Sequence, residues 1–306
     1  PVVSVGNLCM GGSGKTPHVA LILEYLTDYK KAVISRGYGR KNKGLIEANS
    51  IIHSTKDTGD EPMELLHKFE GTSFKMIIDG NRKNALKYLE MHKEKIDLVV
   101  LDDGFQHQYV KRDLNILLTD FSNPFYKDFV LPLGTLREQR KGAKRADIII
   151  VTKCPKDLSP TLESKIKKRI SFYSSATIYF TKITYEGLIN HHNKITSLDS
   201  KKKYLLVTSI ANPSSIYEYL NDNNIKFTAR KFRDHHNFTK TQIQEIITTS
   251  AEHEAVITTE KDWMRLKETE LVNAVSLDIL RLRMKTKFIH SKENITFKDQ
   301  VTSLIN

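Results

Sequence analysis

The most constraining feature of this sequence is a glycine-rich segment at positions 11 to 16, Gly11-Gly12-Ser13-Gly14-Lys15-Thr16. The apolar run Pro1–Val5 precedes it, and a helical pattern of apolar residues over 19–23 follows it. In a strand, turn and helix of this kind, backbone N–H groups surround nucleotide phosphates, the lysine reaches the β- and γ-phosphates, and the threonine hydroxyl binds Mg²⁺. The segment therefore predicts a nucleoside triphosphate site formed by these six residues, with Thr16 also at the metal.

One position departs from the usual pattern of such loops. Cys9 stands where the first glycine is expected, five residues before Gly14. Gly11 and Gly12 supply backbone freedom instead, because glycine adopts conformations that other residues avoid. The alternative to a nucleotide site is a plain tight turn, which the Lys-Thr pair and the preceding strand disfavour.

Strand-like and helical patterns alternate from residue 1 to about 195. Short apolar runs such as Val2–Val5, Phe74–Ile78 and Leu98–Leu101 are separated by segments with helical periodicity. This alternation is typical of βαβ units, whose strands form a parallel sheet covered by helices. We therefore predict an α/β fold with a P-loop NTPase-type, mostly parallel sheet and helices on both faces.

A polar stretch, His191–Lys203, interrupts this alternation and is interpreted as a linker. Strand-like runs resume at Tyr204–Thr208 and Ala255–Thr258, whereas residues after about 267 show little pattern. We predict a P-loop kinase-type domain over 1–195 and a second, smaller α/β domain over 196–306.

The charge balance indicates an acidic partner. The 306 residues include 48 lysines and arginines against 36 aspartates and glutamates, a formal net charge of +12. Nucleic acid, an anionic membrane surface and a phosphorylated substrate would each suit this charge. Cys9 and Cys154 are too few for a disulfide framework or a four-ligand zinc site, which favours a reducing compartment.

No apolar stretch approaches the roughly 18 consecutive residues that span a bilayer. The chain begins at Pro1, inside a predicted strand and without an initiator methionine. We therefore expect residues upstream of it, and the sequence given carries no information on a leader or anchor.

Two aspartates follow the buried strand Leu98–Leu101. Asp102 and Asp103 come directly after it, at the strand end where a P-loop fold holds its Mg²⁺. We predict that one of them reaches the metal, directly or through water. The alternative is that they cap the following turn.

A second acidic pair, Asp60 and Glu61, lies in Thr58-Gly59-Asp60-Glu61-Pro62. Transfer of phosphate to an alcohol requires a group that accepts the hydroxyl proton, so Asp60 is a candidate base and Glu61 a second metal contact. The alternative is an ordinary helix start, with a capping aspartate before glutamate and proline.

Two basic segments are candidates for phosphate binding. Arg36 and Arg40 follow an apolar strand within Ser35-Arg36-Gly37-Tyr38-Gly39-Arg40, and arginine forks suit phosphate groups. The run 137–145 carries five basic residues in nine, which suits lipid headgroups or a substrate phosphate. For both segments the alternative is a solvated basic surface.

The segment Asp234-His235-His236-Asn237-Phe238 places two imidazoles beside a carboxylate. No other clustered ligand accompanies them in the sequence, so an acid–base histidine oriented by Asp234, or plain turn residues, fit better than a metal site.

These segments together resemble the tetraacyldisaccharide 4′-kinases of lipid A biosynthesis, in order and over most of the chain. GGSGKT alone defines only a superfamily, whereas GYGR, GDEP and DDGFQH in this order are far more specific. The matching segments are VSVGNL and GGSGKTP within 3–17, ISRGYGR at 34–40, GDEP at 59–62, LDDGFQH at 101–107, RD at 112–113, LPLGTLRE at 131–138, DHHNF at 234–238 and TTEKD at 258–262.

The resemblance implies a kinase that uses ATP and Mg²⁺ to phosphorylate the 4′-hydroxyl of a lipid A disaccharide 1-phosphate. It also implies a location at the cytoplasmic face of the bacterial inner membrane, in contact with an anionic lipid surface and without an obligate protein partner. Nucleotide is expected between two α/β domains, the smaller of which closes over the cleft.

Carried over by position, Lys15 and Thr16 hold nucleotide and Mg²⁺, and Asp60 acts as the base together with a histidine, for which His235 is chosen over His236. The metal is expected among the acidic side chains of Glu61, Asp102 and Asp103. The substrate-binding candidates in or beside the family motifs are Arg36, Arg40, Gln106, His107, Arg137 and Glu138.

The chain departs from the family pattern in three places. Thr135 stands where a proline is usual, and Ser209 replaces a usual glycine. Family members also carry an apolar N-terminal helix before the first strand, which this sequence lacks. We therefore expect membrane attachment to be peripheral or through an N-terminal segment absent from this chain.

Two other classes of protein were weighed. A P-loop regulatory or metallochaperone GTPase shares the glycine-rich loop, but it requires an Asn-Lys-x-Asp segment, and the nearest string, Thr152-Lys153-Cys154-Pro155, lacks the aspartate. A nucleic-acid-binding protein would explain the charge, yet no recognition helix, zinc finger or aromatic RNA-binding signature is present. We therefore predict no nucleic-acid partner.

Overall fold

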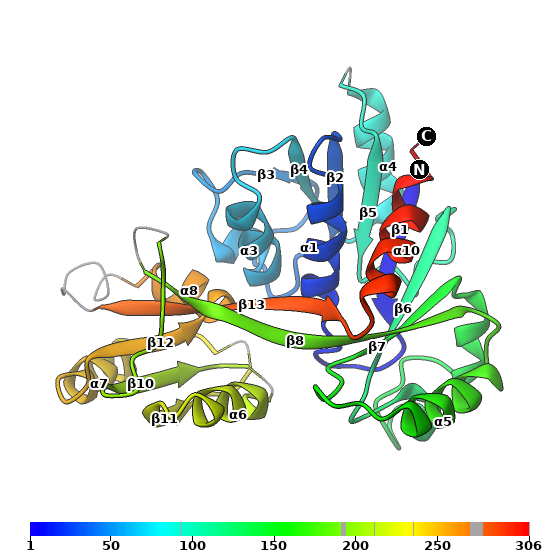
Figure 1. The fold of residues 1–306 in the computed structure, drawn as a ribbon. Coiled ribbons are helices and arrows are strands. Elements are labelled where there is room, and N and C mark those ends of the chain that lie inside the picture. The colour runs from blue at the N-terminus through cyan, green and yellow to red at the C-terminus, as the bar shows by residue number, and fades with distance from the viewer. Residues whose placement is uncertain (93, 191–193, 211, 235, 270–277, 306) are drawn as a thin grey trace. The chain divides into compact units, whose positions relative to one another are not determined.

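The computed structural model describes residues 1–92, 94–190, 194–210, 212–234, 236–269 and 278–305 (Figure 1). The chain divides into two compact units. The first unit comprises Pro1–Lys182 and Thr286–Asn306, and the second comprises Ile183–Lys285.

The first unit is built on a sheet whose neighbouring strands are all parallel except for one edge strand, β3, which runs antiparallel to β4. In spatial order the strands are β8 (Thr177–Ile189), β7 (Ile148–Thr152), β6 (Leu114–Asp120), β1 (Val2–Asn7), β5 (Leu98–Asp102), β2 (Lys31–Ser35), β4 (Phe74–Ile78) and β3 (Ile46–Ala48). Strand β1 lies between β5 and β6, so the carboxyl end of β1 is central to the sheet. Such central strand ends are where ligands bind in open α/β sheets.

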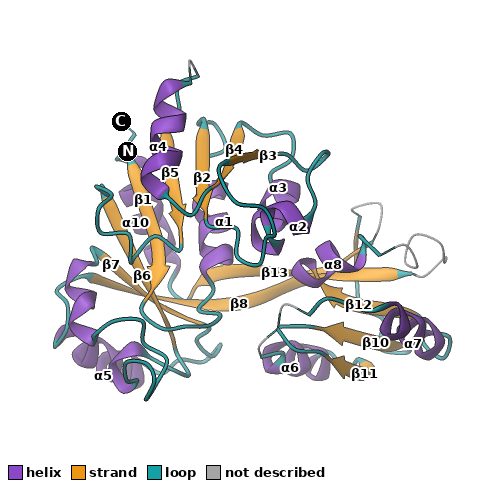
Figure 2. Cartoon of the chain, turned by 180° about the vertical axis from the view of Figure 1, so that it is seen from behind, coloured by secondary structure: helices purple, strands orange, loops and turns teal. Residues whose placement is uncertain are grey.

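Helices cover both faces of this sheet, as the sequence predicts (Figures 1 and 2). Helices α1, α3 and α10 lie on the face turned toward the viewer in Figure 1, and α4 lies on the face seen in Figure 2. The helices of the first unit are α1 (Lys15–Tyr25), α2 (Thr55–Thr58), α3 (Asp60–Lys68), α4 (Arg82–Met91), α5 (Pro160–Ser171) and α10 (Ser291–Thr302), with 3₁₀ turns at Phe125–Lys127 and Arg140–Arg145.

Local sequence explains these elements. Every residue of β2 and β7 is buried, which fits parallel strands covered on both faces. Helix α4 begins where the Asn81 side chain accepts hydrogen bonds from the backbone N–H groups of Lys83 (3.1 Å) and Asn84 (3.2 Å). Its residues Ala85 and Leu89 then pack into one apolar cluster with strands β2, β4 and β5. The apolar strands and amphipathic helices therefore position each other.

The second unit contains a run of four parallel strands, with helices of its own. In spatial order its strands are β11 (Lys226–Lys231), β10 (Lys203–Thr208), β12 (Ala255–Thr259) and β13 (Ile279–Phe288), followed by β8, with β9 (Ile195–Thr196) paired antiparallel to β8. Its helices are α6 (Ser214–Asp222), α7 (Lys240–Ser250) and α8 (Glu260–Leu266).

The units divide the chain differently from the boundary expected at 195/196. The chain leaves the first unit within β8 and returns to it within β13, so residues 286–306 pack with the first unit. Phe297 of α10 is buried there against the rings of Tyr25 and Tyr179, and the Tyr25 hydroxyl donates to Asn294 at 2.6 Å. The apolar face of α10 therefore determines where the C-terminal segment belongs.

Residues after 267 are also more regular than expected, since they include β13 and α10. Among the described residues, no helix combines the length and the apolar character that a bilayer crossing requires.

Candidate nucleotide and metal site

The glycine-rich loop connects the central strand β1 to the start of α1. Gly14 is the N-cap residue of α1 and has a φ of 85°, and Gly11 has a φ of 110°, values that L side chains rarely adopt. Thr16 is buried in the first turn of the helix. The loop thus places Lys15 and Thr16 at a helix N-terminus, where the helix dipole and backbone N–H groups favour an anion such as phosphate.

Two residues at the end of β7 hold this loop from outside. The Thr152 hydroxyl donates to the Ser13 carbonyl at 3.0 Å, and Lys153 Nζ donates to the Gly12 carbonyl at 2.5 Å. Lys153 Nζ also pairs with Asp120 at 2.8 Å. The sequence analysis considered Thr152 and Lys153 only as a failed guanine-binding string. Their position could have been predicted from the parallel sheet, because the carboxyl ends of β1 and β7 lie at the same end of the sheet.

His18 supports the loop from inside the fold. Its Nδ1 lies 2.7 Å from the Gly14 carbonyl and its Nε2 lies 3.1 Å from the Thr181 hydroxyl. Burial lowers the pKa of His18 to about 4, so the ring is neutral at pH 7. Because a carbonyl only accepts, Nδ1 carries the proton and Nε2 accepts from Thr181. This buried residue was also absent from the sequence-based site.

Asp102 ends β5 as a buried carboxylate beside the glycine-rich loop. Ser35 donates to its Oδ2 at 3.0 Å, whereas its buried Oδ1 has no hydrogen-bond partner among the residues that the structure describes. Burial, reinforced by the negative charge of Glu61, raises the pKa of Asp102 to about 7. A buried carboxylate oxygen without a hydrogen-bond partner is destabilised in its charged form, and a second carboxylate nearby adds to this. A bound cation would stabilise both negative charges.

Asp103 adopts a positive φ of 53° and turns toward the cationic side chains. Its carboxylate lies 3.7 Å from Lys15 Nζ and 2.9 Å from Arg137 Nη1. Burial by itself would raise the pKa of Asp103, but Lys15 and Arg137 outweigh it and hold this pKa below its usual value. Asp103 is therefore a carboxylate that links the lysine of the loop to the arginine of the LPLGTLRE segment.

The donor set fits Mg²⁺. Mg²⁺ prefers hard oxygen ligands, commonly one or two carboxylates together with substrate phosphates. The Thr16 hydroxyl, the Asp102 and Asp103 carboxylates and the electrostatically coupled Glu61 provide such oxygens around one lysine. The side-chain amide of Asn7, buried at the end of β1, likewise has no hydrogen-bond partner in the described part of the chain. Asn7 is a further polar residue of this region that the sequence analysis did not single out.

Two glycines bring the SRGYGR and GDEP segments into contact. A Cβ at Gly37 (φ 67°) would lie 2.7 Å from the Thr58 carbonyl, and a Cβ at Gly59 (φ 89°) would lie 2.8 Å from the Tyr38 carbonyl. This close approach fixes the start of α3, where Asp60 is buried in the first turn. Gly59 is the N-cap of α3, so Asp60 is the first helical residue rather than the capping aspartate, and Glu61 beside it acts electrostatically on Asp102.

The basic candidates near this edge differ in their surroundings. Arg36 is exposed, whereas Arg40 donates to the carbonyl of Gly44 in its own loop at 2.8 Å. Burial, and then the charge of Arg82, lower the pKa of His107, which favours the neutral imidazole. Its Nδ1 lies 2.8 Å from the Tyr109 hydroxyl.

Gln106 and Glu138 belong to one side-chain network. Gln106 Nε2 donates to the Asn7 carbonyl at 2.8 Å and to Glu138 at 3.3 Å, and Arg145 pairs with the same Glu138 oxygen at 2.6 Å. Arg137 Nη1 also reaches Gln106 Oε1 at 3.4 Å. The predicted site residues 103, 106, 137 and 138 are therefore brought together.

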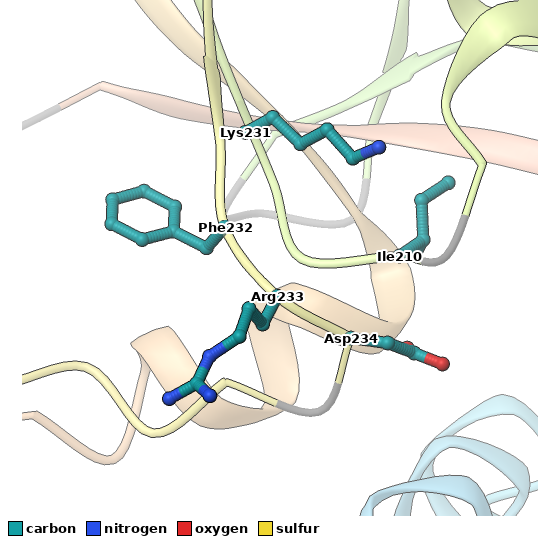
Figure 3. A pocket seen from close by; sticks show the side chains of 5 residues that line it. All are labelled: Ile210, Lys231, Phe232, Arg233 and Asp234. Carbon is teal, nitrogen blue, oxygen red and sulfur yellow. The ribbon is translucent and has the colours of Figure 1, made fainter.

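The DHHNF segment lies in the second unit. Asp234 is 3.6 Å from Lys261, and together with Ile210, Lys231, Phe232 and Arg233 it lines a pocket of about 390 Å³ (Figure 3). His235, the predicted partner of Asp60, lies outside the described residues.

Two other residues of the second unit have structural contacts. His236 Nε2 is 2.8 Å from Gln242 Oε1 in the capping box of α7, and its ring stacks on Phe232. Ser209, which replaces a usual glycine, donates through its backbone N–H to Asp262 at 2.9 Å. The Asp262 carboxylate also accepts a hydrogen bond from the Thr259 hydroxyl at 2.9 Å. Thr259 is the N-cap of α8, so the TTEKD segment forms the start of this helix.

The glycine-rich loop places a lysine and a threonine at the start of α1, and two aspartates lie at the end of β5, the strand next to β1. These features are typical of a P-loop nucleotide-binding protein. A family model described as "LpxK: Tetraacyldisaccharide-1-P 4′-kinase" matches residues 1–305. The chain therefore belongs to the LpxK family.

Individual relatives agree with this membership. A tetraacyldisaccharide 4′-kinase from Flavobacterium psychrophilum is 38% identical over 303 residues, which cover 97% of this chain and 85% of the relative. A tetraacyldisaccharide 4′-kinase from Bacteroides thetaiotaomicron is 39% identical over 284 residues, which cover 87% of this chain and 74% of the relative. A crystal structure of the "apo" form of LpxK from Aquifex aeolicus in complex with ATP is 27% identical, with a TM-score of 0.74, covering all of this chain and 89% of that one.

Proposed function

We propose that this chain transfers the γ-phosphate of ATP to the 4′-hydroxyl of a lipid A disaccharide 1-phosphate. The observation that carries the proposal is the cluster of Lys15, at the start of α1, with Asp102 and Asp103, at the end of β5, in a chain that the family model matches over 1–305. Family membership makes the chain an ATP-dependent kinase of lipid A biosynthesis and does not favour the GTPase alternative.

The loop residues 11–16 bind the phosphates of ATP, with Lys15 as the point charge on the β- and γ-phosphates. Thr16, Asp102, Asp103 and Glu61 would hold Mg²⁺. When bound, this ion would neutralise charge on the phosphate oxygens. Arg137 lies on the other side of Asp103, so it fixes that carboxylate and adds positive charge where negative charge develops.

Asp60 accepts the proton of the acceptor hydroxyl, together with His235. Support for Asp60 comes from its burial at the start of α3 and from the neighbouring Glu61, which couples this turn to Asp102. Since the two residues belong to different units, this role requires the units to approach each other during turnover, as lids do in other kinases.

The remaining candidates serve the acceptor, either by direct contact or by holding the residues around it. Arg36, which is exposed and acts electrostatically on His107, suits the 1-phosphate or another anionic group, and the imidazole of His107 suits a sugar hydroxyl. Arg40, Gln106 and Glu138 act by holding neighbouring groups, because each is engaged by protein atoms.

We place this reaction at the cytoplasmic face of the inner membrane, where ATP is available and the acceptor is anchored by its acyl chains. The net charge of +12 supports contact with anionic headgroups rather than with nucleic acid. No protein partner is required by this proposal.

The test is a transfer assay with purified protein, ATP, Mg²⁺ and a lipid A disaccharide 1-phosphate in detergent. We expect one additional phosphate on the acceptor, detected by mass spectrometry, and none on a soluble disaccharide. GTP in place of ATP is the control for the alternative. Nucleotide hydrolysis without phosphorylated lipid, or a clear preference for GTP, would contradict the proposal.

A further inference from the structure

An unusually apolar loop protrudes beside the P-loop. It comprises Phe129-Val130-Leu131-Pro132-Leu133 and is named here the 129–133 loop. The exposed fractions of Leu133, Phe129 and Leu131 are 86%, 60% and 49%. Single exposed apolar residues are common on soluble proteins, but a run of consecutive ones indicates a surface that contacts another apolar phase.

The loop is built to hold these side chains outward. At its base the buried Asp128 carboxylate accepts the backbone N–H groups of Phe129 at 2.7 Å and Thr135 at 3.1 Å, and also the Thr135 hydroxyl. Leu131 N–H donates to the Leu136 carbonyl at 3.0 Å. A Cβ at Gly134 would lie 2.4 Å from the Phe129 carbonyl, so only glycine lets the two ends approach this closely.

The charges around the loop are cationic. Between residues 127 and 145 every exposed charged residue is basic, namely Lys127, Arg137, Lys141 and Lys144. Neither acidic residue of this stretch is exposed, because the Asp128 carboxylate is enclosed at the loop base by N–H and hydroxyl donors and Glu138 pairs with Arg145. The Arg140 guanidinium lies 5.0 Å from the Phe129 ring. Exposed apolar side chains that are flanked in the sequence by exposed lysines, with Arg140 over one of their rings, match the interface of an anionic bilayer.

The loop is also joined directly to the phosphate site. Met10 N–H donates to the Thr135 carbonyl and Arg137 N–H donates to the Leu8 carbonyl, both at 2.7 Å. Arg137 then extends its side chain to Asp103. The segment that follows the loop, residues 135–137, therefore runs beside the segment that enters the P-loop.

We propose that the 129–133 loop inserts its apolar side chains into the headgroup region of an anionic bilayer, with the surrounding lysines on lipid phosphates. This inference rests on the proposed function, since a lipid-borne acceptor lies in the same bilayer surface. The loop thereby holds the phosphate site at the membrane, in addition to any anchor elsewhere in the protein.

The test uses sedimentation with vesicles of phosphatidylglycerol and phosphatidylethanolamine, without ATP or acceptor. The double variant Phe129→Ser/Leu133→Ser should lower the partition coefficient about tenfold or more, because it removes the two most exposed side chains of the loop. The matched control Ile51→Ser/Phe172→Ser changes side chains that are 84% and 69% exposed elsewhere in the first unit, and it should bind within about twofold of the unchanged protein. The proposal would be overturned if both double variants bound the vesicles as well as the unchanged protein, or if both lost binding to the same extent.

A second measurement reports insertion itself. A Leu133→Trp variant should be quenched by lipids brominated on their acyl chains, whereas Phe172→Trp and the native Trp263 should not. Absence of quenching at 133 would refute insertion. If the loop instead binds the acyl chains of the acceptor, the double serine variant would bind vesicles normally and only raise the KM for the acceptor, which also overturns the proposal. Because the vesicle assays contain no substrate, failure of the kinase function appears separately, in the detergent transfer assay.

Discussion

Lys15 is the residue on which the nucleotide chemistry depends most directly. Its side chain is largely buried and lies 3.7 Å from Asp103, so its charge is held at the mouth of the glycine-rich loop. We expect Lys15→Ala to lower kcat by at least about 10²-fold, because the transition-state charge on the phosphates loses its nearest cation. The thermal unfolding midpoint should change little.

The measurement is steady-state transfer from ATP, with circular dichroism to check folding. Lys43→Ala, in an exposed loop of the same unit, is the matched control and should retain full activity. Turnover by Lys15→Ala close to that of the unchanged protein would contradict the role of the loop.

His18 links the stability of the loop to pH. Its folded-state pKa of about 4 lies below the usual value, so the unfolded chain binds the proton more readily and the group costs stability as pH falls. Compared with a His18→Gln variant, the protein should lose about 2 kcal/mol more free energy of unfolding between pH 7 and pH 5. Urea titrations at both pH values measure this difference. The same loss in both proteins would show that His18 is not buried as a neutral ring.

Thr135 shows how one residue can stabilise a whole element. Its hydroxyl and its N–H both donate to the buried Asp128 carboxylate at the base of the 129–133 loop. Thr135→Val removes only the hydroxyl and should lower the free energy of unfolding by about 1–2 kcal/mol, whereas Thr135→Pro removes both donors and should cost more. Urea denaturation of the two variants tests this order. If the proline variant proved as stable as the unchanged protein, Asp128 would not depend on these donors.

Much of the element-level structure is predictable from the sequence. Buried parallel strands such as Leu98–Asp102 show as continuous apolar runs, and the glycine-rich loop shows as a motif with fixed spacing. Strand β13 also carries a signal, since Leu280 and Leu282 alternate with Arg281 and Arg283, but the sequence analysis missed it.

Other features depend on contacts that no local pattern contains. The GDEP turn lies against the SRGYGR segment because Gly37 and Gly59 let these two distant segments touch. Lys153 and Thr152 become loop-holding residues only because β7 ends at the same sheet edge as β1. The sequence therefore shows the motif segments themselves, whereas the residues that hold those segments in place are visible only in the folded structure.

At the scale of the whole molecule, the chain passes between its two units twice, within β8 and within β13. Composition does not predict this return. Phe297 and Val301 of α10 are apolar, but only the fold shows that α10 buries them in the first unit, where Phe297 packs against Tyr25 and Tyr179. A division by sequence order alone therefore assigned the C-terminal helix to the wrong unit.

The proposed pairing of Asp60 with His235 belongs to this scale, since it joins residues of different units. Asp60→Ala and His235→Ala should each lower kcat by about 10²-fold or more, with a modest change in the KM for ATP. If the two side chains accept the proton jointly, the kcat of the double variant should fall much less than the product of the two single losses. Steady-state kinetics of the three variants measure the coupling.

His236→Ala is the matched control, because that imidazole contacts the cap of α7. We expect it to affect stability more than kcat. Fully multiplicative losses would show that Asp60 and His235 act independently, and a loss at position 236 but not 235 would move the assignment by one residue.

The most direct measurement of the central claim locates the transferred phosphate. The lipid product of the reaction with ATP would be examined by two-dimensional ³¹P–¹H NMR, with Lys15→Ala as the inactive control. We predict a new phosphorus resonance correlated with the proton at carbon 4′ of the disaccharide, while the 1-phosphate signal is unchanged. A new phosphate on another hydroxyl, or inorganic phosphate alone, would contradict the assignment of this chain as a lipid A 4′-kinase.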